Sequence, residues 1–219
     1  MPSRFHYHFR RHDPVMHGVI RRIGPYRLKP ARQDRFGMLV RSIISQQISM
    51  GAARAIRARL QQLVGSEAIE PEMILRLSTP QLRSVGLSPQ KASYLQDVAI
   101  KVESGEVPLA RLSRLPDEKV IAQLIKIKGI GRWTAQMFLI FALGREDVFP
   151  IDDFGVRAAI ERMYEMKSPP EKAALLAIGQ RWSPFASIAS WYCWRYLERT
   201  RAQTATNKRA TSNRRKTTA

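Results

Sequence analysis

The chain has 219 residues, 44% of them hydrophobic, so it is long enough to bury the core of one domain or of two small lobes. Its net charge of +19 is not confined to one end, because residues 199–219 hold only seven of the 37 lysines and arginines, and the excess favours a polyanionic partner. The single cysteine, Cys193, excludes an internal disulfide and a four-cysteine iron–sulfur cluster, and no apolar run approaches the ~20 residues of a membrane span.

The N-terminal segment is rich in histidine and arginine. All the histidines of the chain lie in its first 17 residues, at His6, His8, His12 and His17. A metal site is one interpretation, but arginines alternate with these histidines and Asp13 is the nearest carboxylate, which favours a solvated basic arm without a metal. Asp13 followed by Pro14 predicts a helix start with the aspartate as N-cap.

A strongly apolar helix is predicted for residues 35–49, because its hydrophobic side chains recur at helical spacing on one face. It ends in Gln46-Gln47-Ile48-Ser49, which on polarity alone is a C-terminal turn whose glutamines meet solvent. Further helices follow, including two that open at Thr79-Pro80 and Ser88-Pro89. Residues 85–92 join those two helices, and Lys91 is the best candidate there for a contact with phosphate.

The central pattern of the chain runs over residues 121–156. Apolar residues at helical spacing flank Lys128-Gly129-Ile130-Gly131 and predict two helices joined by a tight turn, the second beginning near Arg132. The glycines permit positive φ angles and let a foreign group approach backbone N–H donors, while Ile130 anchors the turn in the core. The first N–H groups of the second helix face the same approach. Phosphate is therefore the expected ligand at this turn.

Two neighbouring aspartates, Asp152 and Asp153, stand immediately before another helical pattern. Taken without context, an aspartate at this place is an ordinary helix cap. The last apolar helix is aromatic, with Trp191 and Trp194 spaced for packing in the core. No segment shows sustained alternation of period two, so the fold class is all-α. Residues 199–219 have almost no apolar content beyond alanine and are predicted to form a disordered basic tail.

These motifs carry a resemblance. GIGRWTAQMF followed by VFPIDDFGVR, together with RSIISQQISMGAARAI upstream, resembles the helix-hairpin-helix DNA glycosylases, and most closely the alkylated-base glycosylases of the AlkA type. The similarity spans about residues 13–197 in the order of elements. It implies a two-lobed helical bundle, with residues 35–150 as a middle lobe that holds the hairpin. Residues 1–34 and 151–198 form the second lobe, and a cleft between the lobes carries Asp153.

The resemblance also assigns roles to residues. Asp153 matches the catalytic aspartate and Asp152 the neighbouring acid, whose role is support. The base pocket is implied to contain four side chains: Trp133, Met137, Phe154 and Phe185. The residues implied to contact DNA are Gln46, Gln47, Lys128, Gly129, Ile130, Gly131, Arg132 and Thr134. Gln47 matches the position that wedges into the space left by a flipped base, and a monovalent cation at the hairpin carbonyls is an open question.

The function implied is that of a monofunctional DNA-3-methyladenine glycosylase of type II. Such an enzyme flips an alkylated purine out of duplex DNA and hydrolyses its N-glycosidic bond, without a cofactor. Monofunctional action follows because Trp133 stands where bifunctional relatives carry the lysine that forms a Schiff base. Two alternatives remain open, a glycosylase for uracil or hypoxanthine and a non-catalytic DNA-binding protein. We expect a monomer in the cytoplasm, associated with the nucleoid and not with a membrane.

Overall fold

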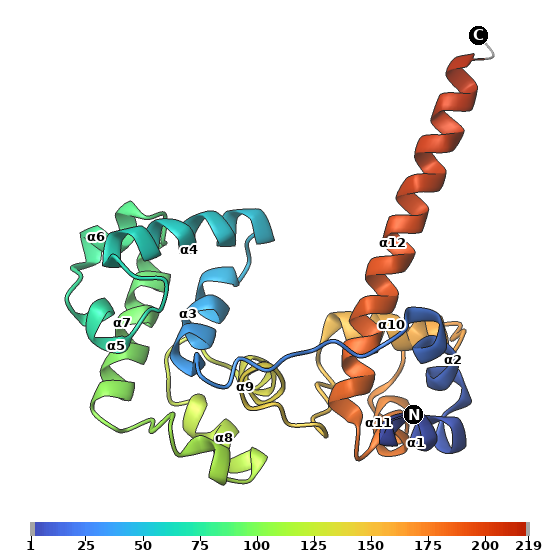
Figure 1. The fold of residues 1–219 in the computed structure, drawn as a ribbon, viewed down its shortest axis with the longest axis horizontal. Coiled ribbons are helices and arrows are strands. Elements are labelled where there is room, and N and C mark those ends of the chain that lie inside the picture. Colours follow the sequence, from blue (N-terminus) through green and yellow to red (C-terminus); the bar gives the residue numbers. More distant parts are fainter. Residues whose placement is uncertain (1–2, 218–219) are drawn as a thin grey trace. The chain divides into compact units, whose positions relative to one another are not determined.

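The computed structural model describes residues 3–217, with side chains described through residue 204. Within that range the chain is helical and contains no strand, which confirms the predicted all-α class (Figure 1). The chain divides into two compact units. The middle unit comprises Lys29–Arg145, and the terminal unit comprises Met1–Leu28 with Glu146–Ala219.

The boundaries of the units differ by a few residues from those expected at 34/35 and 150/151. The backbone N–H of Ala31 donates to the carbonyl of Phe141 over 2.8 Å, which ties the segment before the first apolar helix to the middle unit. The backbone N–H of Ser187 donates to the carbonyl of Glu146 over 2.9 Å, and that of Val148 donates to the Ser187 hydroxyl. These last bonds bring residues 146–148 into the terminal unit.

The middle unit is built on the predicted apolar helix, which buries Leu39, Val40 and Ile43 completely. This helix is α3, and it packs on α4, α7 and α9. In turn, α7 packs on α5 and α6 (Figure 1). The elements of this unit are α3 (Arg35–Ser45), α4 (Met50–Val64), α5 (Pro71–Leu75), α6 (Thr79–Ser84), α7 (Pro89–Glu103), the 3₁₀ helix η1 (Leu112–Arg114), α8 (Asp117–Leu124), α9 (Arg132–Phe138) and the π-helical segment η2 (Leu139–Leu143).

The terminal unit combines an N-terminal and a C-terminal segment of the chain, since α12 packs on both α2 and α10. Its elements are α1 (Arg4–His12), α2 (Pro14–Ile23), α10 (Phe154–Met163), α11 (Lys172–Trp182) and α12 (Ala186–Thr217). Its largest fully buried side chains include Trp182, Tyr192 and Phe9. Aromatic packing therefore joins helices that are more than 150 residues apart in sequence.

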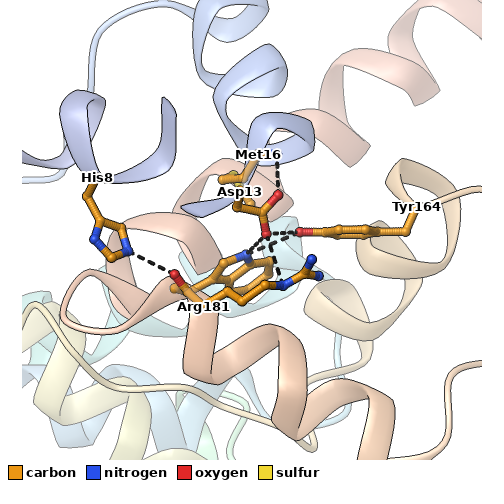
Figure 2. Close-up of polar contacts among 6 residues, drawn as sticks. His8, Asp13, Met16, Tyr164 and Arg181 are labelled. Carbon is orange, nitrogen blue, oxygen red and sulfur yellow. Dashed lines mark hydrogen bonds and ion pairs between the residues drawn. The ribbon is translucent and has the colours of Figure 1, made fainter. Parts of the chain in front are cut away.

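The buried carboxylate of Asp13, at the start of α2, bonds to residues of several helices of this unit, as Figure 2 shows. Asp13 is fully buried and caps α2 by accepting from the Met16 backbone N–H over 3.0 Å, as the sequence predicts. Its Oδ2 accepts from the indole N–H of Trp182 over 3.0 Å and from the Tyr164 hydroxyl. Burial, followed by the bond to Asp13, raises the pKa of Tyr164 far above its usual value. The cluster links α2, α10 and α11.

The C-terminal segment extends the last helix. The sequence predicts disorder over residues 199–219, whereas α12 continues as one helix to Thr217 (Figure 1). Alanine, arginine and lysine are good helix formers, and an extension of an existing helix avoids the cost of nucleation. Residues 218 and 219 lie outside the described residues.

Candidate functional site

The predicted hairpin is present in the middle unit, between α8 and α9. The second helix begins at Arg132, as expected, with Gly131 as its N-cap. Gly129 has a φ of +80°, which is costly for any residue with a side chain. Gly131 has a φ of −94° and a ψ of 175°, so this glycine does not use the positive φ that it permits. Ile130 is buried and anchors the turn, as expected.

The hairpin rests on Tyr94 and Asp97 of α7, two residues that the sequence did not single out. The ring of Tyr94 lies so close to Gly129 that an added Cβ would overlap it. Asp97 accepts from the Lys128 backbone N–H over 2.8 Å and also pairs with the Lys101 ammonium at 3.3 Å. At Gly131 an added Cβ would meet no atom within 4 Å. The turn is therefore packed at Gly129 and open at Gly131.

A second loop, at the end of α3, is bonded to this hairpin. The side-chain amide of Gln46 donates to the Gly129 carbonyl over 2.8 Å. Lys91 donates to the carbonyls of Ile44 and Gln46, each over 2.7 Å, and its burial lowers its pKa. Lys91, the best candidate for a phosphate contact in a segment expected mainly to join two helices, therefore caps the end of α3. Gln47, exposed at the tip of the loop, has a φ of +56°.

The start of α9 presents both polar and aromatic groups. Arg132 forms a two-pronged ion pair with Glu118, whose pKa it lowers through these hydrogen bonds. The indole of Trp133 is 46% exposed, whereas Thr134 and Met137 are buried. Trp133 is thus a large aromatic group at the surface, directly after the hairpin.

The two neighbouring aspartates of the terminal unit differ in burial. Asp153 is only 6% exposed, and its Oδ1 accepts from the Val156 backbone N–H over 2.7 Å as the N-cap of α10. The same oxygen accepts from the indole N–H of Trp194 over 2.9 Å. Asp152 is exposed. The structure thus holds one carboxylate of the pair in a fixed, largely dry position.

Trp194 is a site residue that the sequence reasoning missed, because its spacing from Trp191 indicated core packing alone. A signal was available, since an indole N–H that is largely removed from water needs an acceptor. Gly155 makes the contact possible, because a Cβ there would lie 2.9 Å from Trp194 and 3.1 Å from the Asp153 oxygen.

The two phenylalanines expected near a base lie in very different surroundings. Phe154, the first residue of α10, is 79% exposed. Phe185 is 6% exposed and packs edge-on against the rings of Phe5 and His8, with centroids 6.5 and 5.4 Å away. Phe185 therefore belongs to the aromatic core of the terminal unit.

Neither a metal cluster nor a membrane helix is found in the part of the chain that the structure describes. Over residues 3–217 there is no group of three or more histidine, cysteine, aspartate or glutamate side chains placed to hold a metal ion. No helix in that range is long and apolar enough to cross a membrane.

With these elements in place, comparison with known proteins defines the class. Residues 40–184 match the model of the HhH-GPD superfamily base excision DNA repair proteins, so the chain belongs to that superfamily. Within it, DNA-3-methyladenine glycosylase 1 of Schizosaccharomyces pombe is 33% identical over 181 residues, covering 81% of this chain and 79% of that protein. The Bacillus subtilis protein YfjP is 34% identical over 169 residues, and the match spans 74% of this chain but only 59% of YfjP.

Solved structures agree with the sequence comparison. The DNA-3-methyladenine glycosidase of Bacillus halodurans superposes with a TM-score of 0.80 at 36% identity, over 88% of each chain. The S. pombe 3-methyladenine DNA glycosylase Mag1, solved in complex with abasic DNA, superposes with a TM-score of 0.79 at 31% identity. That match covers 88% of this chain and 96% of Mag1. The fold is therefore that of helix-hairpin-helix glycosylases.

Proposed function

We propose that this protein is a monofunctional type II DNA-3-methyladenine glycosylase that removes alkylated purines from duplex DNA. The observation that carries the proposal is the Asp153 carboxylate, which is buried and held at the N-terminus of α10 by Val156 and Trp194. The relatives named for this activity supply the context. We propose that the protein acts as a monomer in the cytoplasm on nucleoid DNA, without a cofactor.

The chemistry required of Asp153 is electrostatic. Cleavage of an N-glycosidic bond develops oxocarbenium-like positive charge on the sugar, and a carboxylate near C1′ stabilises charge that exists only in the transition state. The same group orients or deprotonates the attacking water. Two fixed donors hold the Asp153 Oδ1, so little reorganisation is needed as charge develops. Asp152, which is exposed, takes the supporting role.

A single carboxylate is enough when the leaving group is already positive. Purines alkylated at N3 or N7 carry that charge and need little protonation to leave. This matches a chain whose aspartate pair offers one buried carboxylate, Asp153, and one exposed one, Asp152. The reaction class is therefore hydrolysis of a weakened N-glycosidic bond.

We assign the main contacts with the DNA backbone to the hairpin of the middle unit. Backbone N–H groups around Gly131, at the open side of the turn, are suited to a phosphate because an added Cβ there meets no atom. Lys128 and the start of α9 with Arg132 and Thr134 lie beside them. The remaining hairpin residues, Gly129 and Ile130, shape the turn.

The second contact to DNA is the loop at Gln46 and Gln47. Hydrogen bonds from the side chains of Gln46 and Lys91 hold this loop against the hairpin and α3. The exposed Gln47 is therefore carried by a well-held loop. We assign Gln47 to the gap that a flipped nucleotide leaves. A glutamine fills a base stack less well than a bulky apolar group, so we expect this wedge to be a modest one.

The flipped base is assigned to an aromatic surface that includes Trp133. Its half-exposed indole offers a π face to a cationic ring. Met137 and Phe185 are buried and Phe154 is exposed, so these three contribute less directly than Trp133. Because Trp133 carries no amine, we assign no lyase step, and the product is an abasic site.

The direct test is base release from methylated duplex DNA. Purified protein is incubated with DNA that carries 3-methyladenine and 7-methylguanine, and the released bases are measured by chromatography. We expect release of both bases and strand breaks only after alkaline treatment. Strand cleavage without alkali would contradict monofunctional action. Binding of the duplex without base release would leave a non-catalytic DNA-binding protein.

A further inference from the structure

The two N-terminal helices contain a hollow that the proposed activity does not use. This hollow, of about 340 Å³, is formed by side chains of α1 and α2. Its lining residues are His6, Tyr7, Arg10, His17 and Arg21. Two of these side chains are guanidinium groups, which are always charged, and two are imidazoles, which become charged on protonation.

No acidic residue lines the hollow. Asp13 is the one acidic residue among the first 33 positions of the chain, and it is fully buried in the cluster of Figure 2. It is committed to the Met16 N–H, the Trp182 indole and the Tyr164 hydroxyl. The four basic groups therefore converge without a counter-ion in the lining, and their mutual repulsion is relieved by any anion that enters.

The ring contacts around the hollow hold its donors in place. The imidazoles of His6 and His17 meet edge to face with centroids 6.4 Å apart, and the ring of Phe5 stacks on His6 at 4.8 Å. The Arg10 guanidinium lies 5.3 Å from the centre of the Tyr7 ring. Two helices thus present two imidazoles and two guanidinium groups toward one volume.

We propose that this hollow binds a phosphate group, supplied by a phosphodiester of the DNA backbone. Arginine forks and protonated imidazoles are the donors that match phosphate oxygens, through charge-assisted hydrogen bonds. The excess of basic residues over the whole chain favours nucleic acid as the source, while free phosphate has the same chemistry. The site serves as an additional anchor on DNA, separate from the hairpin of the middle unit.

Protonation of the imidazoles sets the pH dependence of the site. Burial, and then the neighbouring His17, lower the pKa of His6. The charged groups facing His6 are Arg10 on its own helix and His17 and Arg21 on α2. Burial and His17 disfavour the protonation of His6, whereas a bound phosphate favours it. Binding of phosphate therefore weakens as pH rises and His6 loses its proton.

The test uses the full chain and two double variants with the same change in charge. Arg10→Ala/Arg21→Ala removes both arginines of the hollow, and Arg11→Ala/Arg22→Ala removes their neighbours on the same helices; all four side chains are exposed. Affinity for an undamaged, fluorescently labelled duplex is measured by anisotropy over a salt series at pH 6 and pH 8. We expect the first variant to lose about threefold or more affinity beyond the second, and to reduce the slope of log K against log salt by about 1.

A second measurement follows the imidazole resonances of all the histidines by NMR while inorganic phosphate is added at constant ionic strength. We expect saturable shifts for His6 and His17, absent in the Arg10→Ala/Arg21→Ala variant, with His8 and His12 as internal controls. Saturable shifts combined with equal duplex affinities for the two variants would keep the phosphate site but overturn DNA as its source. Linear shifts, or equal shifts at every histidine, would overturn the site itself. Base release by the same variants at saturating enzyme reports separately on the proposed activity.

Discussion

Replacing either glycine of the hairpin with alanine adds one methyl group, and the two substitutions should have different effects. Gly131→Ala adds a Cβ where no atom lies within 4 Å, at backbone angles that alanine adopts freely. The substitution should change the free energy of unfolding by less than about 1 kcal/mol, because the freedom lost by the unfolded chain is offset by the poorer N-cap propensity of alanine at the start of α9. The same methyl group stands where we propose that a phosphate meets backbone N–H groups. Loss of one charge-assisted bond costs about 1.5–3 kcal/mol, or on the order of 10- to 100-fold in affinity.

Gly129→Ala is the contrasting variant. Here the φ of +80° costs an L-residue about 1–2 kcal/mol, and overlap with the Tyr94 ring adds about 1–3 kcal/mol. Thermal unfolding and duplex anisotropy are measured together on both variants. We expect Gly129→Ala to lose stability, and Gly131→Ala to lose affinity for damaged and undamaged duplexes alike. Wild-type affinity in Gly131→Ala, or a loss confined to one lesion, would refute the reasoning.

Three further substitutions test individual side chains of the site. Trp133→Ala should reduce single-turnover release of cationic 7-methylguanine and 3-methyladenine about thirtyfold more than release of neutral hypoxanthine, since a dry cation–π contact is worth ~2 kcal/mol; equal losses would mean that the indole acts by shape alone. Lys91→Met keeps the aliphatic stem but removes two bonds to carbonyls of α3, so the free energy of unfolding should fall by about 2 kcal/mol in a denaturant titration; an unchanged midpoint would count against its capping role. Trp194→Phe removes one donor from Asp153 and should lower kcat about tenfold with little change in KM, whereas wild-type kinetics would assign Trp194 to packing.

Local features of this chain could be predicted from its sequence because they depend on neighbouring residues. The cap of α2 at Asp13, the start of α9 at Arg132 and the burial of Ile130 each follow from a few consecutive side chains. The helical class followed from apolar spacing in the same way. The sequence also placed Asp153 before a helix, and the structure gives it the expected cap bond to Val156.

Contacts between distant segments could not be predicted. The packing of Tyr94 under Gly129 and the bonds from Lys91 to the end of α3 join residues more than 30 positions apart, and no local pattern marks them. Lys91 illustrates the difficulty, because a lysine after a turn is equally suited to a phosphate and to a helix carbonyl. The C-terminal segment is a different case, since its poverty in apolar residues argues against burial but not against continuation of α12.

The central claim is that the Asp153 carboxylate promotes cleavage of the N-glycosidic bond. Asp153→Asn keeps the shape and an oxygen that can cap α10 but removes the charge, while Asp152→Asn is the matched control at an exposed neighbour. Single-turnover release of 7-methylguanine is measured for both variants, together with duplex affinity. We predict a loss on the order of 10²- to 10³-fold for Asp153→Asn with affinity preserved, and a much smaller loss for Asp152→Asn. Turnover near that of the wild type in Asp153→Asn would contradict it.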